Sequence, residues 1–432
     1  MSRTVAPATR VTGDVTVPGD KSISHRALII GAIARGPSYI GNLSPAADVG
    51  ATSRCLEACG GRQRTFGAAR VALEGSGPGH GLRSPHTVLD CGNSGTTMRL
   101  LAGALSGHDV EATLDGDESL RRRPMRRIAE PLRAMGAAVD TSNAGTAPII
   151  VSGRSHLKGI TWEMPVASAQ VKSAILLAGL SAAAPTTVVE PQSTRDHTER
   201  LMRLCGVDVV TEGTRVTLTP STPNAFGLRV PGDLSAAAFF LALAAARPGW
   251  RVRCDGVGLN PGRTGILDVL SDMGAAVEVT EGEAGPEPVG GVEVRGSQLT
   301  ATTISGDLTV RCIDEIPAIA VLATQAEGTT RISDAAELRT KESDRIGRLA
   351  DGLRALGAVC EPTADGLVIE GPVSLRGAHI DSAGDHRLAM AWAIAAALVG
   401  DGQSSLISGA EAVAVSYPAF FDDLERLLSA HP

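Results

Sequence analysis

Short apolar segments with helical periodicity alternate with short β-branched segments along most of the chain. Five of the helical segments end on a glycine that directly precedes a strand-like segment, a position typical of a left-handed helix C-cap. These glycines lie 68 to 83 residues apart and are Gly60, Gly136, Gly206, Gly274 and Gly357. A sixth helical segment, FFDDLERLL, follows near the end of the chain. The pattern predicts six similar α/β units of about 72 residues each.

A longer repeat includes these units. VPGDKS at 17–22 recurs as VPGDLS at 230–235, and each copy precedes an apolar helix rich in small residues. The 432 residues exceed the roughly 250–300 at which a single core stops growing, so we expect two lobes of three units each. The predicted lobes are 1–19 with 234–432, and an inserted lobe 20–233, with chain crossings near 18–21 and 231–234.

Composition limits the class of protein. The net charge is −7 and aromatic residues make up only 3% of the chain, which argues against a nucleic-acid-binding surface. The alanine-rich apolar stretches 235–246 and 388–399 are shorter than the ~18–20 residues of a membrane span, and no signal peptide is visible. The seven cysteines form no CxxC pair, so we expect free buried thiols and no metal site. We therefore predict a soluble, cytoplasmic protein that binds anions, if at all, through local clusters.

The first helical pattern, Ser24 to Gly36, begins with unusually polar residues. Lys21 and Ser22 precede it, and Arg26 lies in its first turn. Ser22 can cap the helix, and free backbone N–H groups together with two cations make an anion site. A capped helix with solvated basic residues is the alternative at this point.

Later units repeat this arrangement. A glycine-rich turn with Asn93 and Gly95 precedes a helical pattern, and glycine allows a ligand to approach the backbone closely. Five arginines lie within 121–127, where most are expected to be solvated or paired with acids and one can point inward to bind a phosphate or carboxylate. Further helix starts carry Ser168 with Gln170 and Lys172, and Arg195. A purely structural turn or a solvated charge run remains the alternative for each segment.

The second half of the chain adds acid–base groups. Asp314 directly precedes an apolar helical pattern, and Lys341, Glu342 and Arg345 are predicted to lie in the first turn of another helix. A third helix opens with DHR at 385–387. Carboxylates at helix starts are commonly caps. Carboxylates beside cations are also typical of a proton-transfer site that stabilises developing charge.

Seven motifs in order resemble those of the 5-enolpyruvylshikimate-3-phosphate synthase family. They are PGDKSISHRALI, GNSGTTMRL, RRPM, SAQVKSAILLAGL, TRDHTER, LRTKESDRI and DHRLAM. The resemblance runs from about Val15 to Phe421. It implies a two-lobed, inside-out α/β barrel of six βαβαββ repeats, three per lobe. It also implies transfer of the enolpyruvyl group of phosphoenolpyruvate to the 5-hydroxyl of shikimate 3-phosphate, in the shikimate pathway of aromatic amino-acid biosynthesis.

The resemblance also assigns site residues. The implied phosphoenolpyruvate ligands are Lys21, Asn93, Gly95, Arg123, Gln170, Arg345, His386 and Arg387. The implied shikimate 3-phosphate ligands are Lys21, Ser22, Arg26, Ser168, Ala169, Gln170, Arg195, Asp314 and Lys341. Glu342 is the implied acid toward the methylene carbon and Asp314 the implied base toward the hydroxyl, with Lys341 close to both steps. The division of proton transfer among these three stays open, because neighbouring groups titrate together. The resemblance implies no metal or organic cofactor, no nucleic-acid or membrane partner, and a monomer.

Some features depart from the family pattern. Val415 lies where some relatives carry a lysine that contacts phosphoenolpyruvate, and TRDHTER fits the class II subgroup. Many members of that subgroup have alanine where this chain has Gly95. The family is the target of glyphosate, and Gly95 leads to the hypothesis that this chain is sensitive to it.

Three other functions are alternatives for this sequence. The sister family that transfers enolpyruvyl to UDP-N-acetylglucosamine usually has a cysteine or an aspartate shortly before the Arg-Pro matched by Arg123 and Pro124, and ESLRRRP has no cysteine there. A non-catalytic anion-binding protein would be favoured by loss of Asp314, Lys341 or Glu342, and all three are present. A paralogue that acts on a modified acceptor stays open.

Overall fold

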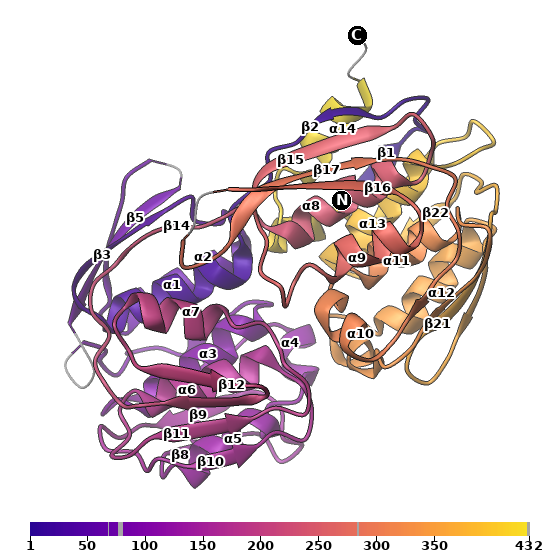
Figure 1. The fold of residues 1–432 in the computed structure, drawn as a ribbon. Helices are drawn as coiled ribbons and strands as arrows, with labels where there is room; N and C mark the ends of the chain where they lie inside the picture. Colours follow the sequence, from indigo (N-terminus) through magenta and orange to yellow (C-terminus); the bar gives the residue numbers. More distant parts are fainter. Residues whose placement is uncertain (68, 77–80, 283–284, 430–432) are drawn as a thin grey trace. The chain divides into compact units, whose positions relative to one another are not determined.

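The computed structural model describes residues 1–67, 69–76, 81–282 and 285–429. The chain divides into two compact units, which are described separately below. We call Gly19–Val230 the inserted unit, and Met1–Pro18 together with Pro231–Pro432 the split unit. Both units are built from helices and small mixed sheets (Figure 1).

The inserted unit contains helices α1 to α7. They are α1 (Lys21–Ile33), α2 (Ala47–Ala58), α3 (Gly95–Ser106), α4 (Glu118–Arg122), α5 (Arg126–Ala134), α6 (Ala169–Gly179) and α7 (His197–Leu204). Its strands are β3 (Arg35–Gly41), β4 (Arg62–Thr65), β5 (Arg70–Ser76), β6 (Leu89–Asp90), β7 (Glu111–Asp115), β8 (Ala138–Asp140), β9 (Ile149–Ser152), β10 (Thr161–Glu163), β11 (Thr186–Val189), β12 (Val209–Glu212), β13 (Arg215–Leu218) and β14 (Gly227–Arg229). They form the sheets β14-β3-β5-β4, β6-β7-β9-β8 and β10-β11-β13-β12.

The split unit contains helices α8 to α14. They are α8 (Leu234–Ala245), α9 (Gly265–Asp272), α10 (Gly306–Cys312), α11 (Ile316–Ala323), α12 (Arg345–Ala355), α13 (His386–Ala397) and α14 (Phe420–Ser429), with 3-10 helices η1 (Ala336–Thr340) and η2 (Ala410–Val415). Its strands are β1 (Ser2–Val5), β2 (Thr12–Asp14), β15 (Arg251–Gly258), β16 (Ala276–Glu281), β17 (Val289–Arg295), β18 (Thr303–Ile304), β19 (Gly328–Ile332), β20 (Val359–Pro362), β21 (Leu367–Gly371), β22 (His379–Asp381) and β23 (Ser405–Ser408). They form the sheets β16-β17-β15-β2, β18-β19-β21-β20 and β1-β23-β22.

One strand order recurs in the four-stranded sheets. In the sheet β6-β7-β9-β8, β6 runs parallel to β7, while β9 lies between β7 and β8 and is antiparallel to both. Two strands are exchanged between sheets. Strand β2 precedes α1 and β3 in the chain but pairs in parallel with β15, and β14 precedes α8 and β15 but pairs in parallel with β3. The N-terminal strand β1 completes the last sheet by pairing antiparallel with β23. The sheets β6-β7-β9-β8, β10-β11-β13-β12 and β18-β19-β21-β20 are thus each one βαβαββ repeat, and the exchanged strands explain why VPGD occurs twice.

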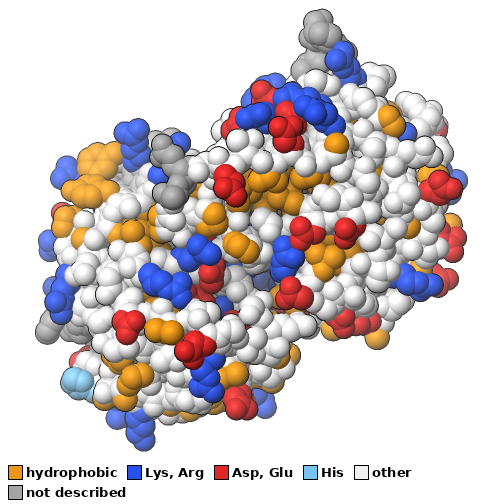
Figure 2. All heavy atoms as spheres, viewed as in Figure 1, with side chains coloured by type: hydrophobic (Ala, Val, Ile, Leu, Met, Phe, Trp, Pro, Cys, Tyr) orange, Lys and Arg blue, Asp and Glu red, His pale blue; other side chains and the backbone are white. Residues whose placement is uncertain are grey.

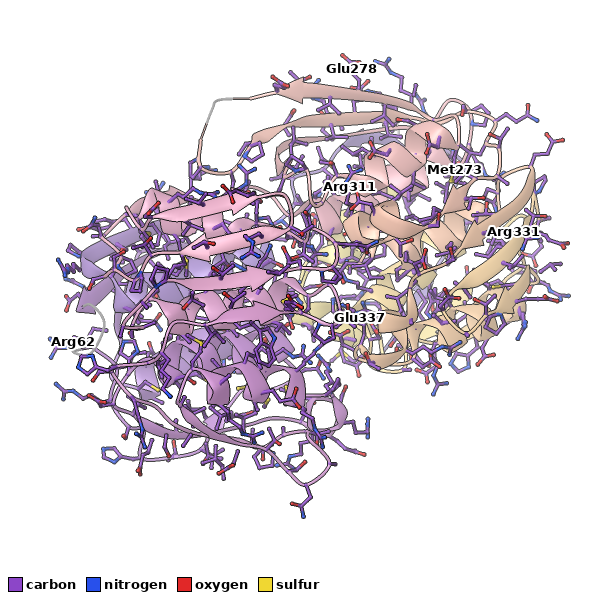
Figure 3. The ribbon with its side chains drawn as sticks, turned by 60° about the horizontal axis from the view of Figure 1, so that its bottom comes forward. Arg62, Met273, Glu278, Arg311, Arg331 and Glu337 are labelled. Carbon is purple, nitrogen blue, oxygen red and sulfur yellow. The ribbon has the colours of Figure 1, made fainter. Side chains whose placement is uncertain are left out.

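The helices form the core of each unit and the sheets lie outside it. Every residue of α8, α11 and α13 is buried, as expected for helices that are apolar on all sides. The outer strands carry charge instead: Arg251 contacts Glu293 at 2.6 Å, and charged side chains gather over β15 to β17 (Figure 2). Glu278 of β16 and Arg331 of β19 are exposed at the outer edge of the split unit (Figure 3). This is the inside-out arrangement.

The glycine repeat has the predicted backbone role. Gly60, Gly136, Gly206, Gly274 and Gly357 all follow a helix and have φ between +75° and +98°. Strands β4, β8, β12, β16 and β20 begin two or three residues later. Left-handed φ is the conformation that only glycine adopts at little cost, which confirms the five C-caps.

The first helix differs from its prediction. The structure places α1 at Lys21–Ile33 rather than at Ser24–Gly36. Its N-cap is Asp20, whose carboxylate accepts a 2.8 Å hydrogen bond from the Ile23 N–H. The prediction of Ser22 as the cap is therefore wrong, since the carboxylate of Asp20, two residues earlier, accepts the capping hydrogen bond. Its C-terminal end is earlier too, because Arg35 already belongs to β3.

The seven cysteines are free and buried, as predicted. Burial raises the pKa of Cys59 and of Cys205 to about 12. We expect a disulfide reagent such as 5,5′-dithiobis(2-nitrobenzoic acid) to modify the native protein slowly at about pH 8, because the thiolate is the reactive form. The urea-denatured protein, the control, should react at all seven thiols. Rapid stoichiometric modification of the native protein would contradict this prediction.

No helix of the described chain is long and apolar enough to cross a membrane.

Candidate functional site

The first turn of α1 holds a half-buried ion pair. Lys21 Nζ lies 3.0 Å from Asp48 Oδ2 in the first turn of α2. The next turn carries His25, which is buried and accepts from or donates to Thr52 Oγ1 at 2.7 Å. Burial holds the pKa of His25 well below its usual range, and the charges of Lys21 and Arg26 lower it further. Lys21 is thus a half-buried ammonium group that is paired with Asp48.

Arg26 is positioned by hydrogen bonds from three segments. Its Nε donates to Thr198 Oγ1 at 2.7 Å, its Nη2 to Ser173 Oγ at 2.8 Å, and its Nη1 to the Ser22 carbonyl at 2.9 Å. Thr198 belongs to α7 and Ser173 to α6, so the guanidinium joins three helices of the inserted unit. Ser22 itself is half-buried. Arg26 is therefore fixed in place without a ligand.

The glycine-rich turn brings further groups together. Arg123 Nη2 donates to Asn93 Oδ1 at 2.8 Å, and Asn93 Nδ2 donates to Asp117 at 2.6 Å. A Cβ on Gly95 would lie 2.9 Å from Arg99 Nη1 and 3.2 Å from Arg123 Nη1, so the guanidinium groups occupy the space that the missing side chain leaves. The turn and the arginine segment therefore form one site.

Gln170 connects this turn to α6. Its Oε1 accepts from Arg99 Nη1 at 2.6 Å and its Nε2 donates to Thr96 Oγ1 at 2.9 Å. Ser168 is the N-cap of α6 and accepts from the Val171 N–H, and Ala169 is the first helical residue. The predicted helix start is thus confirmed, with Gln170 placed against the glycine-rich turn.

Within the arginine run, one guanidinium is buried. Arg121 pairs with Asp115 at 2.6 Å and Arg122 with Glu118 at 2.6 Å, and both arginines are exposed. Arg123 is 6% exposed. Arg121 and Arg122 are therefore exposed and paired with acids, whereas Arg123 points inward to Asn93. One inward-pointing arginine was predicted for this segment.

The segment before α7 carries Arg195. This residue is half-buried and precedes Asp196, which is the residue before α7 begins. Next to it lies a buried group: Lys172 of α6, expected with Ser168 and Gln170 as a polar residue at an anion-binding helix start, is paired with Glu190 and Glu199 instead. Burial alone would lower the pKa of Lys172, but the two carboxylates outweigh it and raise that pKa. A lysine within an apolar helix pattern was the only sequence signal for this group.

The split unit contains the second cluster. Asp314, between α10 and α11, lies 3.9 Å from Lys341 Nζ, 3.8 Å from Arg345 Nη1 and 3.9 Å from Arg387 Nη2. Arg387 Nη1 also donates to the Asp314 carbonyl at 2.9 Å. Lys341 further contacts Glu337 of η1 at 3.6 Å (Glu337 is labelled in Figure 3). One carboxylate is thus surrounded by three cations that come from different segments of the chain.

Arg345 is the centre of this cluster. It is 1% exposed, and its guanidinium contacts Asp385 through Nε at 2.8 Å and Nη2 at 3.1 Å, and Glu342 at 2.6 Å. Burial by itself would lower the pKa of Arg345, but Asp385 and Glu342 raise it above its ordinary value. Asp385 is fully buried and also caps α13 through the Arg387 N–H. His386 follows it and is buried.

One placement differs from the prediction. Lys341 and Glu342 lie between η1 and α12 instead of in the first turn of a helix. Asp344 is the N-cap, since its carboxylate accepts from the Gly347 N–H, and α12 begins at Arg345. Outside the helix, Lys341 can turn toward Asp314 while Glu342 turns toward Arg345. Val415 ends η2 and is half-buried.

The predicted site residues therefore fall into two groups, which we call the anion cluster and the acid–base cluster. The acid–base cluster is in the split unit and consists of Asp314, Lys341, Glu342, Arg345, His386 and Arg387. The anion cluster is in the inserted unit and consists of Lys21, Ser22, Arg26, Asn93, Gly95, Arg123, Ser168, Ala169, Gln170 and Arg195. Sequence reasoning missed that Asp48 pairs with Lys21 and that Asp385 pairs with Arg345. Both were visible only as acids near helix starts, a signal shared by many caps.

The chain matches a family model described as EPSP synthase (3-phosphoshikimate 1-carboxyvinyltransferase) over residues 5–424. It is 50% identical to a 3-phosphoshikimate 1-carboxyvinyltransferase of Roseiflexus sp., with 99% of each chain covered. It is 49% identical to that of Bacillus licheniformis, with 96% of this chain and 97% of the other covered. Its structure is similar to EPSP synthase of Acinetobacter baumannii, with a TM-score of 0.86, 42% identity, and 99% of this chain and 98% of that one covered.

A more distant likeness extends to the enolpyruvyl transferase NikO of Streptomyces tendae, with a TM-score of 0.78 and 19% identity. The likeness covers 98% of this chain and 96% of that one and concerns the fold alone. The fold class expected from the repeats is thereby confirmed. The chain belongs to the EPSP synthase, or 3-phosphoshikimate 1-carboxyvinyltransferase, family.

Proposed function

We propose that this protein transfers the enolpyruvyl group of phosphoenolpyruvate to the 5-hydroxyl of shikimate 3-phosphate and releases phosphate. The observation that carries the proposal is the position of Asp314 within 3.8–3.9 Å of Lys341, Arg345 and Arg387. A carboxylate next to fixed cations can take up a proton while the cations stabilise negative charge on a departing phosphate. Family membership supplies the identity of the two substrates.

Both substrates carry a phosphate and a carboxylate, and the proposal assigns ligands from both clusters. Phosphoenolpyruvate is bound by Lys21, Asn93, Gly95, Arg123, Gln170, Arg345, His386 and Arg387. Shikimate 3-phosphate is bound by Lys21, Ser22, Arg26, Ser168, Ala169, Gln170, Arg195, Asp314 and Lys341. Arginine suits these roles because its planar donors bind two anion oxygens at once. The hydrogen bonds that already fix Arg26 and Arg123 reduce the entropy lost on binding.

The chemistry divides into addition and elimination. In the addition, the 5-hydroxyl oxygen bonds to C2 of phosphoenolpyruvate, Asp314 takes the hydroxyl proton with help from Lys341, and Glu342 gives a proton to C3. The resulting intermediate has a methyl group at C3 and still carries phosphate on C2. In the elimination, the C2–O bond to phosphate breaks, C3 returns a proton to Glu342, and the departing phosphate takes the hydroxyl proton that Asp314 holds. The cations of the acid–base cluster stabilise the leaving phosphate.

The free structure adds a constraint on Glu342. Its carboxylate contacts the Arg345 guanidinium at 2.6 Å. An anionic substrate that binds Arg345 competes with Glu342 for the same guanidinium. The proposal therefore requires this contact to be displaced when the substrate binds.

The direct test is phosphate release from phosphoenolpyruvate by the purified protein. Shikimate 3-phosphate, shikimate and UDP-N-acetylglucosamine are supplied separately as acceptors. Release only with shikimate 3-phosphate is the expected result. Release with another acceptor would assign a sister activity, and release with none would contradict the proposal.

A substitution at the glycine-rich turn tests the anion cluster. Gly95→Ala places a Cβ 2.9 Å from Arg99 Nη1 and 3.2 Å from Arg123 Nη1, so at least one guanidinium must shift. We expect the KM for phosphoenolpyruvate to rise about tenfold, because misplaced ligands lose positioning. We expect weaker inhibition by glyphosate as well, consistent with a sensitive wild-type enzyme.

Steady-state kinetics and inhibition constants check both effects. Gly227→Ala is the matched control, because its Cβ would meet no atom within 4 Å. Equal weak inhibition of the wild-type enzyme and Gly95→Ala would contradict the proposed sensitivity.

We propose further that the enzyme works as a cytoplasmic monomer on these small molecules.

A further inference from the structure

A buried lysine between two carboxylates lies beside the segment that carries Arg195. Lys172 Nζ is 2.8 Å from Glu190 Oε2 and 2.7 Å from Glu199 Oε1, and each of the three side chains is at most 2% exposed. Glu190 follows β11 and Glu199 lies in the first turn of α7. Lys172 also donates to the Thr194 carbonyl at 3.3 Å. We call Lys172, Glu190 and Glu199 the buried triad.

The triad contacts Thr194, the residue before Arg195, at its carbonyl, its hydroxyl and its N–H. The Thr194 carbonyl accepts from Lys172, and the Thr194 hydroxyl donates to Glu190 Oε1. The Thr194 N–H also points to Glu190 Oε2 at 3.5 Å. The segment from the end of β11 to the start of α7 is therefore tied down immediately before the arginine.

A second polar contact joins α6 to α7. Ser173, the residue after Lys172, contacts Thr198, the residue before Glu199, at 2.7 Å. Both hydroxyls also accept from the Arg26 guanidinium. The start of α7 is thus set against α6 by two neighbouring polar contacts, and one of them includes an arginine of the anion cluster.

The triad has an excess of negative charge, with two carboxylates for one ammonium. If Lys172 is removed, two carboxylates stay buried without a counter-ion, which is a costly arrangement. Well-packed apolar residues of similar volume are often at least as stabilising as a buried ion group. Stability alone therefore does not account for a triad that connects three segments beside a binding residue.

We propose that Lys172, Glu190 and Glu199 are positioning residues that set the place of Arg195 and thereby the affinity for shikimate 3-phosphate. The inference rests on the proposed function, in which Arg195 and Arg26 bind that substrate. Phosphoenolpyruvate has other ligands in the proposal. The triad should therefore affect the affinity for one substrate and leave the other nearly unchanged.

The experiment compares three variants with the wild-type enzyme. Lys172→Met keeps length and removes charge, and we expect the KM and Kd of shikimate 3-phosphate to rise about 10- to 100-fold. Adding Glu199→Gln to that variant removes one of the two uncompensated charges and should recover part of the affinity. Thr194→Val removes one hydroxyl from a half-buried residue and should raise the KM of shikimate 3-phosphate several-fold. The kcat and the KM of phosphoenolpyruvate should stay close to the wild-type values.

Thr187→Val is the matched control. It removes the hydroxyl contact between Thr187 of β11 and Thr217 of β13. Thr194→Val and the double variant carry the test if Lys172→Met does not fold. Variants that bind shikimate 3-phosphate like the wild type, or that lose affinity for both substrates equally, would overturn the positioning role. Calorimetry with shikimate 3-phosphate on the wild type separates the positioning role from the proposed function. Absence of both binding and turnover in the wild type would overturn the proposed function as well.

Discussion

Replacing Glu342 by glutamine is expected to lower kcat by about 10²- to 10⁴-fold, the usual contribution of a positioned general acid. Glutamine keeps the shape of the side chain and can still accept a hydrogen bond from Arg345, but it cannot deliver a proton to carbon. Because the lost interaction belongs to the transition state, kcat and kcat/KM should fall together while the KM of each substrate changes little. Phosphate release at saturating substrates measures the effect.

The control is Glu370→Gln, which changes an exposed glutamate of β21 in the same unit. It should leave kcat unchanged. Asp314→Asn should also lower kcat, since it removes the proposed base and the carboxylate that three cations surround. A Glu342→Gln enzyme with wild-type kcat would exclude Glu342 as the acid and leave Lys341 as the candidate.

Replacing Asp385 by asparagine is expected to reduce the free energy of unfolding by about 3–5 kcal/mol, as for other buried ion pairs from which one partner is removed. Asp385 is fully buried and neutralises Arg345, which is 1% exposed. It also accepts hydrogen bonds from the Ser343 hydroxyl and the Arg387 N–H. The substitution therefore weakens a buried pair and a helix cap together, and it frees the arginine that the proposal assigns to phosphoenolpyruvate.

Urea and thermal unfolding measure this loss. The matched control is Asp351→Asn, whose carboxylate is exposed and lies 3.9 Å from the half-exposed Arg354. An exposed pair of this kind contributes about 0–1 kcal/mol, so the control should unfold like the wild type. Equal unfolding curves for both variants would show that Asp385 does not neutralise Arg345.

The repeat was readable from the sequence because its signal is local. A glycine that ends a helix is required by backbone geometry alone, so Gly60 and its four counterparts could be assigned without knowledge of tertiary contacts. The exchange of β2 and β14 could not be derived in this way. Strand pairing depends on which distant segments meet, and VPGD indicated only that two similar crossings exist.

Part of the site could be predicted because it also depends on local sequence signals. Asp314 and the cap positions Ser168 and Asp385 follow from helix starts, which are local features. The error at Ser22 arose because two acceptors in sequence, Asp20 and Ser22, both suit a cap, and only the backbone of the turn selects between them. The partners of two cations could not be assigned from the sequence, because Asp48 lies 27 residues from Lys21 and Asp385 lies 40 residues from Arg345.

The sequence by itself determined the number of repeats, the glycine C-caps of five helices and the residue types able to bind anions and transfer protons. Each of these depends on backbone conformation or on side-chain chemistry within a few residues. Only the tertiary structure decided which cations are neutralised, which of five neighbouring arginines turns inward, and that Lys172 joins Glu190 to Glu199 beside Arg195. Burial and charge compensation depend on contacts between segments far apart in the chain, which no local pattern specifies.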